Sequence, residues 1–139
     1  YPEKHMEAPS FDSDIHFLKQ KIQNGADYII TQMFFDNQKF FDFVAKCRNE
    51  GITVPIIPGL KPLATKKQLN QIPLRFSIDL PDQLIMEVVK AKDNEAVRQI
   101  GIEWCTAQSK ELLAAGIPVL HYYSMGKSDN IKQIAQAMF

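Results

Sequence analysis

The sequence lacks the features that mark several classes of protein. Sixteen basic and sixteen acidic residues give a formal net charge of +0, and no run of like charge occurs. We therefore expect no nucleic-acid-binding surface and no affinity for an anionic membrane. No apolar stretch is long enough to cross a bilayer, and no secretory leader opens the chain, so we expect a cytoplasmic protein. No Cys/His cluster has metal-ligand spacing, so no metal is expected.

Cysteine is scarce, with two residues in the chain, Cys47 and Cys105. Both fall on the apolar faces of predicted helices. We interpret them as small buried hydrophobic residues in a reducing compartment rather than as a disulfide.

Apolar residues are plentiful: 45% of the 139 residues are hydrophobic and 10% are aromatic. This composition supports a real core and excludes a disordered chain, and the length fits one domain at most. The opening ten residues carry two prolines and no initiator methionine, and they are typical of a loop that follows a strand. This pattern suggests that residues 1–139 are part of a longer protein.

A near-continuous apolar run over residues 29–36 is the central feature of the chain. A strand that is apolar on both faces is typical of a parallel sheet covered by helices. In such a strand Gln32 shares a face with Tyr28, Ile30 and Phe34. A buried primary amide needs partners for two donors and two acceptor lone pairs. Either neighbouring backbone or a heterocyclic ligand could supply them.

The chain repeats a helix, a glycine and an apolar strand. Gly25, Gly51 and Gly116 end predicted helices, and the strands that follow cover residues 29–36, 52–57 and 117–123. Further helices are expected over residues 65–71, over residues 81–115 with a break at Asp93, and over residues 129–138 with Ser128 as the cap. Alternating helices and strands predict an α/β fold with a parallel sheet, and polar residues end each strand, where such folds place their sites. The opening of the chain resembles a fourth strand end of the same kind, and four such units are half of a (βα)8 barrel.

Four motifs occur in order: Tyr1-Pro-Glu-Lys-His5 with Ala8, residues 25–36, residues 55–59 and residues 120–123. Together they resemble the methylenetetrahydrofolate reductase family along nearly the whole chain, most weakly between residues 72 and 113. The resemblance implies a (βα)8 TIM barrel that holds FAD. It also implies hydride transfer from NAD(P)H through the flavin to 5,10-methylenetetrahydrofolate, giving 5-methyltetrahydrofolate. Residues 1–139 would be a partial domain, the C-terminal half of the barrel from the end of strand five through helix eight.

The resemblance assigns cofactor contacts near the start of the chain. Tyr1, His5 and Ala8 match a flavin-contacting loop, and Asp14 and Lys21 match helix positions that reach FAD hydroxyls and phosphate. Spacing alone favours solvated charges for the last two, because residues seven apart share one side of a helix.

The resemblance also assigns substrate contacts. Gln32 matches the folate-binding glutamine, and Gln68 matches a second substrate-side position. Lys127 stands where many relatives have arginine; it can meet a folate carboxylate as a point charge, without the bidentate fork. The family's substrate-stacking phenylalanine has no clear match; Ile72 falls nearby, and Phe76 is the closest aromatic.

No catalytic residue is expected in this chain. The family's catalytic glutamate and flavin-tuning aspartate belong to the first half of the barrel, and Glu3 and Glu7 are not substitutes. His121 lies inside a strand, where a structural role is favoured. The chain alone is therefore expected to be inactive, as a homo-oligomer or paired with the missing N-terminal half. A self-associating non-catalytic half-barrel and a different ligand-binding TIM-barrel enzyme are the alternatives.

Overall fold

The computed structural model describes residues 2–3, 11–124 and 126–139, so the predicted positions Tyr1, His5 and Ala8 lie outside the described residues. Six helices and four short strands occur in this part of the chain. In order they are α1 (Phe11–Gln23), β1 (Ile29–Ile30), α2 (Asn37–Asn49), β2 (Ile56–Ile57), β3 (Gly59–Leu60), α3 (Gln68–Phe76), α4 (Asp82–Lys90), α5 (Asn94–Ala114), β4 (His121–Tyr122) and α6 (Asp129–Met138).

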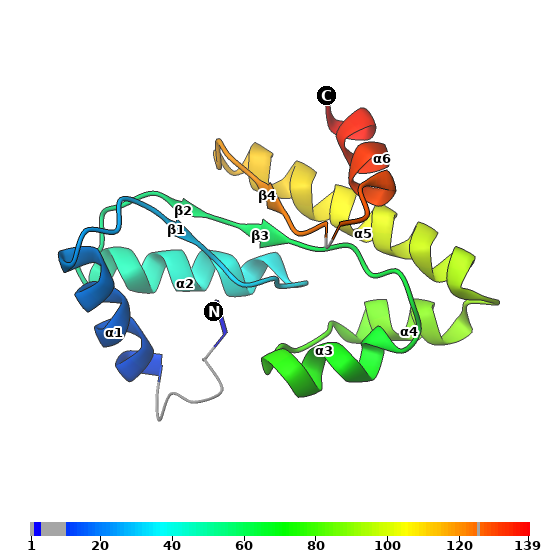
Figure 1. Ribbon diagram of the computed structural model, residues 1–139, viewed down its shortest axis with the longest axis horizontal. Coiled ribbons are helices and arrows are strands. Elements are labelled where there is room, and N and C mark those ends of the chain that lie inside the picture. Colours follow the sequence, from blue (N-terminus) through cyan, green and yellow to red (C-terminus); the bar gives the residue numbers. More distant parts are fainter. Residues whose placement is uncertain (1, 4–10, 125) are drawn as a thin grey trace.

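The strands are parallel, as the sequence predicts. β1 pairs with β2, with Ile29 opposite Ile56, and β3 pairs with β4, with Gly59 opposite His121. Only Pro58 separates β2 from β3, so one extended segment pairs with β1 along its first part and with β4 along its second (Figure 1). The described chain is therefore an α/β structure whose strand segments lie side by side in sequence order.

The strand boundaries differ from the prediction. The strand expected over residues 52–57 does not end at Pro58 and Gly59, because the chain stays extended and Gly59 begins the second ladder. Pro58 has no N–H, but its carbonyl accepts a hydrogen bond of 3.0 Å from the backbone N–H of His121. β4 likewise covers two residues of the expected 117–123, since ladder pairing there is limited to the length of β3.

The strand expected over residues 29–36 is also shorter. Helices were expected to cover both of its faces, but one face is exposed near its start. Its ladder spans β1 and extends by one bond, from the N–H of Thr31 to the carbonyl of Ile57 at 3.0 Å. On the face opposite to the Thr31 side chain, Tyr28 is 56% exposed and Ile30 is 40% exposed, because no described element packs over them.

The helix caps follow the sequence closely. Asp36 caps α2 by accepting a hydrogen bond of 2.9 Å from the N–H of Gln38, and Asp93 caps α5 by accepting one of 2.9 Å from the N–H of Ala96. The sequence predicts that Asp36 or Asn37 starts the first of these helices and that Asp93 or Asn94 caps the second, and the structure has the aspartate as the cap in both. The predicted break between α4 and α5 near Asp93 is confirmed. Ser128 stands at the expected position before α6, but its side chain makes no capping hydrogen bond.

Helix α3 is the largest departure from the prediction. A helix was expected over residues 65–71, followed by an irregular segment, whereas α3 spans Gln68–Phe76 and contains Pro73. A proline inside a helix removes one hydrogen bond and normally ends the helix. Here Ile72 is 4% exposed in the core, and Leu69 and Phe76 pack against the same cluster, so burial of the apolar stripe offsets the missing bond.

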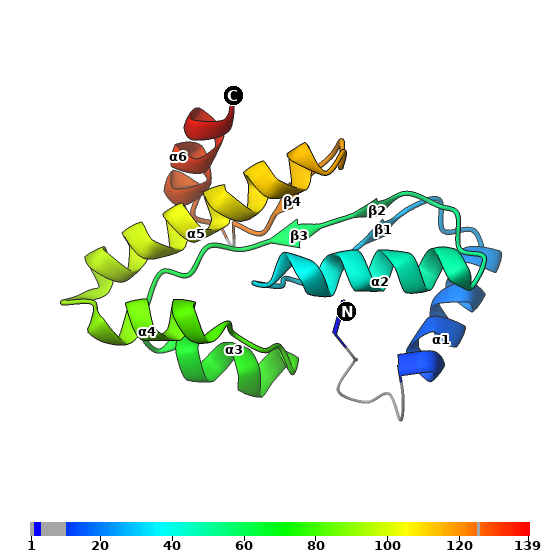
Figure 2. The ribbon, with the colours of Figure 1, turned by 180° about the vertical axis from the view of Figure 1, so that it is seen from behind.

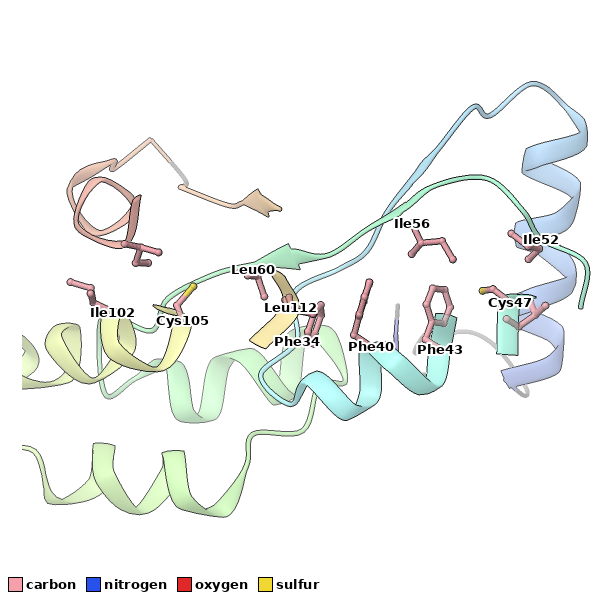
Figure 3. Packing of buried hydrophobic residues seen from close by; sticks show 12 residues of the cluster. Phe34, Phe40, Phe43, Cys47, Ile52, Ile56, Leu60, Ile102, Cys105 and Leu112 are labelled. Atoms are coloured by element: carbon pink, nitrogen blue, oxygen red, sulfur yellow. The ribbon is translucent and has the colours of Figure 1, made fainter. Parts of the chain in front are cut away.

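Two apolar clusters form the core. The first lies between the strands and helices α2 and α5, where the rings of Phe34 and Phe40 stack with centroids 5.3 Å apart and Leu60 and Leu112 are fully buried (Figure 3). The second joins the end of β1 to α3, α4 and the start of α5. Both views of the ribbon place α1 at one end of the strands and α3 with α4 towards the other (Figures 1 and 2).

The two cysteines are buried and free, as predicted. Burial raises the pKa of Cys47 to about 11 and that of Cys105 to about 12, because desolvation disfavours the thiolate. Within the described ranges, no helix combines the length and apolar character needed to cross a membrane. The same ranges contain no group of three or more Cys, His, Asp and Glu side chains that could hold a metal ion.

Candidate functional site

A cavity of about 470 Å³ lies where the strands end, beside α3. Gln32 and Met33 reach it from the end of β1, Lys61 from the end of β3 and Tyr123 from the end of β4. Helix α3 supplies the rest of the lining, namely Gln68, Gln71, Ile72, Arg75 and Phe76. The carboxyl ends of parallel strands are where α/β folds place their ligand sites.

A larger cavity of about 560 Å³ lies between residues 2–3 and α2, and Glu3 is part of its lining. Burial raises the pKa of the Glu3 carboxyl, although its Oε2 accepts a hydrogen bond of 3.0 Å from the N–H of Asp79. No strand residue lines this cavity, so it lacks the convergence of strand ends seen beside α3. We therefore take the cavity beside α3, called the strand-end cavity below, as the candidate site.

Gln32 is half-buried, not fully buried as the sequence suggested. Its Oε1 accepts a hydrogen bond of 3.0 Å from the N–H of Met33, so neighbouring backbone occupies one of the two lone pairs of the amide oxygen. Among the described residues, none accepts a hydrogen bond from its Nε2. The NH2 group and one lone pair of the amide oxygen thus remain for a ligand.

Gln68 opens α3 and is tied to the loop before that helix. Its Oε1 accepts hydrogen bonds from the N–H of Ala64 at 2.7 Å and of Thr65 at 3.2 Å. These bonds hold residues 64–65 in place and fix the amide oxygen of Gln68. As with Gln32, no described residue accepts from its Nε2.

Tyr123 and Thr31 clamp the wall of the cavity. The Tyr123 hydroxyl donates a hydrogen bond of 2.8 Å to the carbonyl oxygen of Thr31, and the Thr31 hydroxyl oxygen accepts one of 2.9 Å from the N–H of Gly59. A Cβ atom on residue 59 would overlap the Thr31 carbonyl and would lie 2.7 Å from a Tyr123 ring carbon. Glycine is therefore required where the three strand ends meet. Burial raises the pKa of Tyr123, so the hydroxyl keeps its proton.

Lys61 and Arg75 give the cavity its charge, since no Asp or Glu among the described residues lines it. Lys61 is half-buried, and burial alone lowers the pKa of its ammonium. Arg75 is exposed on α3. The sequence did not predict Lys61, Arg75 or Tyr123 as site residues. The one available signal was the position of Lys61, two residues after Gly59 at a strand end.

A buried polar network holds the loop after β1 against α5. The indole N–H of Trp104 donates to the carbonyl of Phe35 at 2.9 Å, and Nε2 of Gln108 donates to the carbonyl of Phe34 at 3.2 Å and to Oδ1 of Asn37 at 3.1 Å. Asn37 returns a bond of 3.1 Å to the backbone carbonyl of Gln108. This network fixes the chain immediately after Gln32 and so limits where its amide can lie.

Three further predicted site residues that the structure describes, Asp14, Lys21 and Lys127, do not line the strand-end cavity. Asp14 and Lys21 lie on α1, which both views place away from α3 (Figures 1 and 2). Lys127 is exposed in the turn before α6. Ile72 and Phe76, the two positions considered for ring stacking, do line the cavity. His121 is half-buried and makes an edge contact with the ring of Tyr123, with centroids 4.6 Å apart.

Comparison with known proteins identifies the family. The model of the methylenetetrahydrofolate reductase family matches residues 1–138. The chain belongs to the methylenetetrahydrofolate reductase family. A probable methylenetetrahydrofolate reductase (NADPH) of Caenorhabditis elegans is 35% identical over 140 residues, which cover 99% of this chain and 21% of that protein.

Other members of the family show the same partial coverage. Methylenetetrahydrofolate reductase (NADH) 1 of Zea mays is 38% identical over 90% of this chain and 23% of its own length. For 5,10-methylenetetrahydrofolate reductase of Pectobacterium carotovorum the values are 32%, 93% and 44%. The chain thus spans about a fifth to under a half of these methylenetetrahydrofolate reductases.

One solved structure has a similar fold. It is an uncharacterised protein from Clostridium thermocellum, described as binding two copies of 5-methyl-5,6,7,8-tetrahydrofolic acid. It superposes with a TM-score of 0.58 at 24% identity, over 98% of this chain and 49% of that one. The likeness shows that this chain shares its fold with about half of that chain.

Proposed function

We propose that the protein carrying this chain reduces 5,10-methylenetetrahydrofolate to 5-methyltetrahydrofolate with NAD(P)H, through bound FAD. In this proposal the chain supplies the folate-facing wall of the site, and the catalytic acid comes from outside it. The observation that carries the proposal is the meeting of Gln32 and Gln68 at the strand-end cavity. The two residues are 36 positions apart in the sequence, and the family resemblance had assigned both to the substrate. The names of the relatives and the folate bound by the structural neighbour support the same ligand class.

The architecture proposed for the whole domain is a (βα)8 barrel, with this chain as its part from the end of strand five through helix eight. Three parallel strand segments in sequence order, each preceded or followed by helices, support this arrangement. The exposed face of β1, with Tyr28 and Ile30, is where the N-terminal half would pack. On its own the chain is expected to pair through this face with another copy. A monodisperse monomer in sedimentation velocity would contradict that expectation.

For FAD, the described part of the chain offers Asp14 and Lys21 on α1. Seven residues correspond to about 10 Å along a helix, and the two positions lie on the same side of it. A carboxylate suits ribose hydroxyls and an ammonium suits a phosphate, so the pair fits the polar end of the cofactor. Lys21 is exposed and therefore accessible to a bound nucleotide. When bound, the flavin supplies the hydride-transfer chemistry.

A flavin-bleaching experiment tests the proposal. The full-length protein is reconstituted with FAD, and absorbance of the oxidised flavin is followed after addition of NADH or NADPH and then of 5,10-methylenetetrahydrofolate. We expect bleaching by the nucleotide and recovery of the yellow colour on addition of the folate. A protein that is not bleached, or that stays bleached with the folate present, would contradict the proposal.

The variant Gln32→Ala separates the two half-reactions. Loss of the amide should raise the folate concentration needed for reoxidation by about tenfold, because one hydrogen bond to the ligand is lost. Bleaching by the nucleotide should be unchanged. Gln23→Ala, at the exposed end of α1, is the matched control and should behave as the unmodified protein.

A further inference from the structure

A separate cavity of about 410 Å³ lies between the start of α2 and the middle of α5, and we call it the α2–α5 cavity. The part of its lining that matters here comes from the loop after β1, from the first residue of α2 and from α5, namely Phe35, Asp36, Asn37, Trp104, Gln108 and Glu111. No described residue lines both this cavity and the strand-end cavity. The proposed function therefore leaves it without a role.

The side-chain N–H donors at the α2–α5 cavity are already in use. Nε2 of Gln108 donates twice, to the carbonyl of Phe34 and to Oδ1 of Asn37. Nδ2 of Asn37 also donates twice, to the carbonyl of Gln108 at 3.1 Å and to Oε1 of Glu111 at 3.2 Å. The indole N–H of Trp104 is bonded to the carbonyl of Phe35. These side chains therefore offer a ligand only acceptors.

Gln108 carries the acceptor that most needs a donor. The residue is 6% exposed, and its Oε1 is buried with no partner among the described residues. The amide cannot be reversed, because its oxygen would then face the carbonyl oxygen of Phe34. A buried amide oxygen without a donor is costly. Because Gln108 lines the α2–α5 cavity, a ligand there that brings N–H groups would offset this cost.

The charge of the α2–α5 cavity is negative. Glu111 lies one turn after Gln108 on α5, and Asp36 lies across from them at the start of α2. One oxygen of each carboxylate is used, by Asn37 and by the N–H of Gln38, and no described residue donates to the other. No Lys or Arg among the described residues lines the cavity. The occupant that fits is therefore a cation.

We propose that the α2–α5 cavity binds a guanidinium group, with Gln108, Glu111 and Asp36 as its acceptors. A guanidinium has five N–H donors in one plane, no acceptor and a permanent charge, so it can serve several acceptors at once. It also stacks on aromatic side chains, which Phe35 and Trp104 supply in the lining. An ammonium has three donors and is more strongly hydrated, so it matches this wall less well.

Two sources can supply a guanidinium group. One is a free guanidino compound. The other is an arginine of the parent protein outside residues 1–139, since the chain covers 21% to 44% of the relatives compared above. The sources differ in a measurable way, because an arginine of the protein itself would keep an added compound out of the cavity.

Saturation-transfer NMR on the full-length protein tests the proposal, because this method detects the weak binding expected of a single side-chain group. The probe is N-acetylarginine amide. N-acetylcitrulline amide is its uncharged isostere, and N-acetyllysine amide carries an ammonium instead. The same samples are then unfolded thermally to give the Tm of each variant.

The variants remove charge from the cavity and keep its hydrogen bonds. Glu111→Gln retains an oxygen that can accept from Asn37, and Asp36→Asn retains one that can cap α2. Glu103→Gln is the matched control. Glu103 is also exposed on α5 and accepts one side-chain bond, from Gln99 at 3.2 Å, but it does not line the cavity.

We expect the arginine compound to bind, the lysine compound to bind several times more weakly, and the citrulline compound to bind at least about tenfold more weakly. Glu111→Gln and Asp36→Asn should each weaken binding about threefold, as loss of a partly exposed ion pair does. Glu103→Gln should have no effect, and added salt should weaken binding of the arginine compound to the unmodified protein.

A protein that fills the cavity with its own arginine gives a second supporting pattern. The added compound then does not bind, and Glu111→Gln lowers the Tm by about 2 °C or more beyond Glu103→Gln, because the ion pair is internal. Absence of binding together with equal Tm values for these two variants would overturn the proposal. Equal binding of the arginine and citrulline compounds, tighter binding of the lysine compound, or binding that neither carboxylate variant changes would also overturn it. None of these outcomes bears on the proposed function, which the flavin-bleaching experiment tests separately.

Discussion

The hydroxyl of Tyr123 donates a hydrogen bond of 2.8 Å to the backbone carbonyl of Thr31. Thr31 follows β1 and Tyr123 follows β4, so the bond joins the two outer strand segments across the one between them. Gly59 lies beneath this bond and leaves space for the tyrosine ring. The wall of the strand-end cavity is thus fixed by a contact between residues 92 positions apart.

Replacing Tyr123 by phenylalanine should destabilise the fold by about 1–2 kcal/mol, because the buried Thr31 carbonyl loses its donor. Urea denaturation, followed by the fluorescence of the chain's single tryptophan, measures the change. Tyr28→Phe is the matched control, since Tyr28 is 56% exposed and should shift the midpoint very little. Equal effects of the two substitutions would contradict a structural role for the Tyr123 hydroxyl.

Replacing Gly59 by alanine should destabilise the protein by about 1–3 kcal/mol, as overpacking does elsewhere. The added methyl group would meet Tyr123 and the Thr31 carbonyl, and the strand ends must separate to admit it. Gly25→Ala provides a comparison without crowding, because a Cβ atom added at residue 25 would have no neighbouring atom within 4 Å. There the φ of +111° is the one source of strain for an alanine. Its expected cost is about 1 kcal/mol. Gly59→Ala should in addition weaken folate binding, which Gly25→Ala should leave unchanged.

Replacing Gln108 by leucine should cost about 2 kcal/mol, because the carbonyl of Phe34 and the side-chain oxygen of Asn37 lose a buried donor. Part of this cost is offset, because the substitution also removes Oε1 of Gln108, which is buried without a partner among the described residues. Gln99→Leu, on the exposed side of the same helix, removes only a surface bond to Glu103 and should change stability by less than about 0.5 kcal/mol. Thermal unfolding of the two variants measures this difference, and equal midpoints would contradict the prediction.

The two thiols should resist modification in the native protein. With pKa values raised to about 11 and 12, the thiolate fraction of Cys47 and Cys105 at pH 8 is on the order of one in a thousand or lower. A chromogenic disulfide reagent should therefore titrate neither cysteine in buffer and both in denaturant. Rapid labelling of either thiol in the folded state would show that its surroundings open easily.

The pH dependence of stability should reveal the burial of Lys61. Its ammonium is charged in both folded and unfolded states at neutral pH, and burial lowers its pKa below the usual 10.5 in the folded state alone. The folded protein therefore loses this proton first as the pH rises, and the penalty fades between the lowered pKa and 10.5. Lys61→Met should accordingly be more stable than the unmodified protein at pH 7, and the difference should shrink towards pH 10. A difference that stays constant or grows with pH would contradict this origin.

Much of the fold could be predicted from short-range sequence patterns. A short acceptor side chain before an apolar helical stripe predicts a helix start at Asp36 or Asn37 and at Asp93 or Asn94. In the structure the aspartate is the cap in both cases. Gly25, Gly51 and Gly116 have positive φ, which favours glycine after a helix. These features depend on a few neighbouring residues, so periodicity and residue type were sufficient to predict them.

The predictions were wrong or incomplete where contacts between residues far apart in the sequence determine the structure. Pro73 indicates a helix end locally, yet α3 continues through it because Ile72 is buried against residues far along the chain. The strand-end cavity shows the same division. Gln32 and Gln68 were predicted through the family resemblance, whereas Lys61 and Tyr123 carry no local pattern and join the site only through the pairing of β3 with β4.

Helix α5 touches the chain below the cavity with no side chain between them. At Gly101 a Cβ atom would overlap the carbonyl oxygen of Leu63 and lie 2.7 Å from its carbonyl carbon, so the helix rests directly on the backbone two residues after Lys61. The 61–67 loop therefore cannot be exchanged on its own without disturbing its contact with α5. A chimaeric protein that exchanges residues 61–67 should therefore exchange α5 with them, so that this backbone contact is kept.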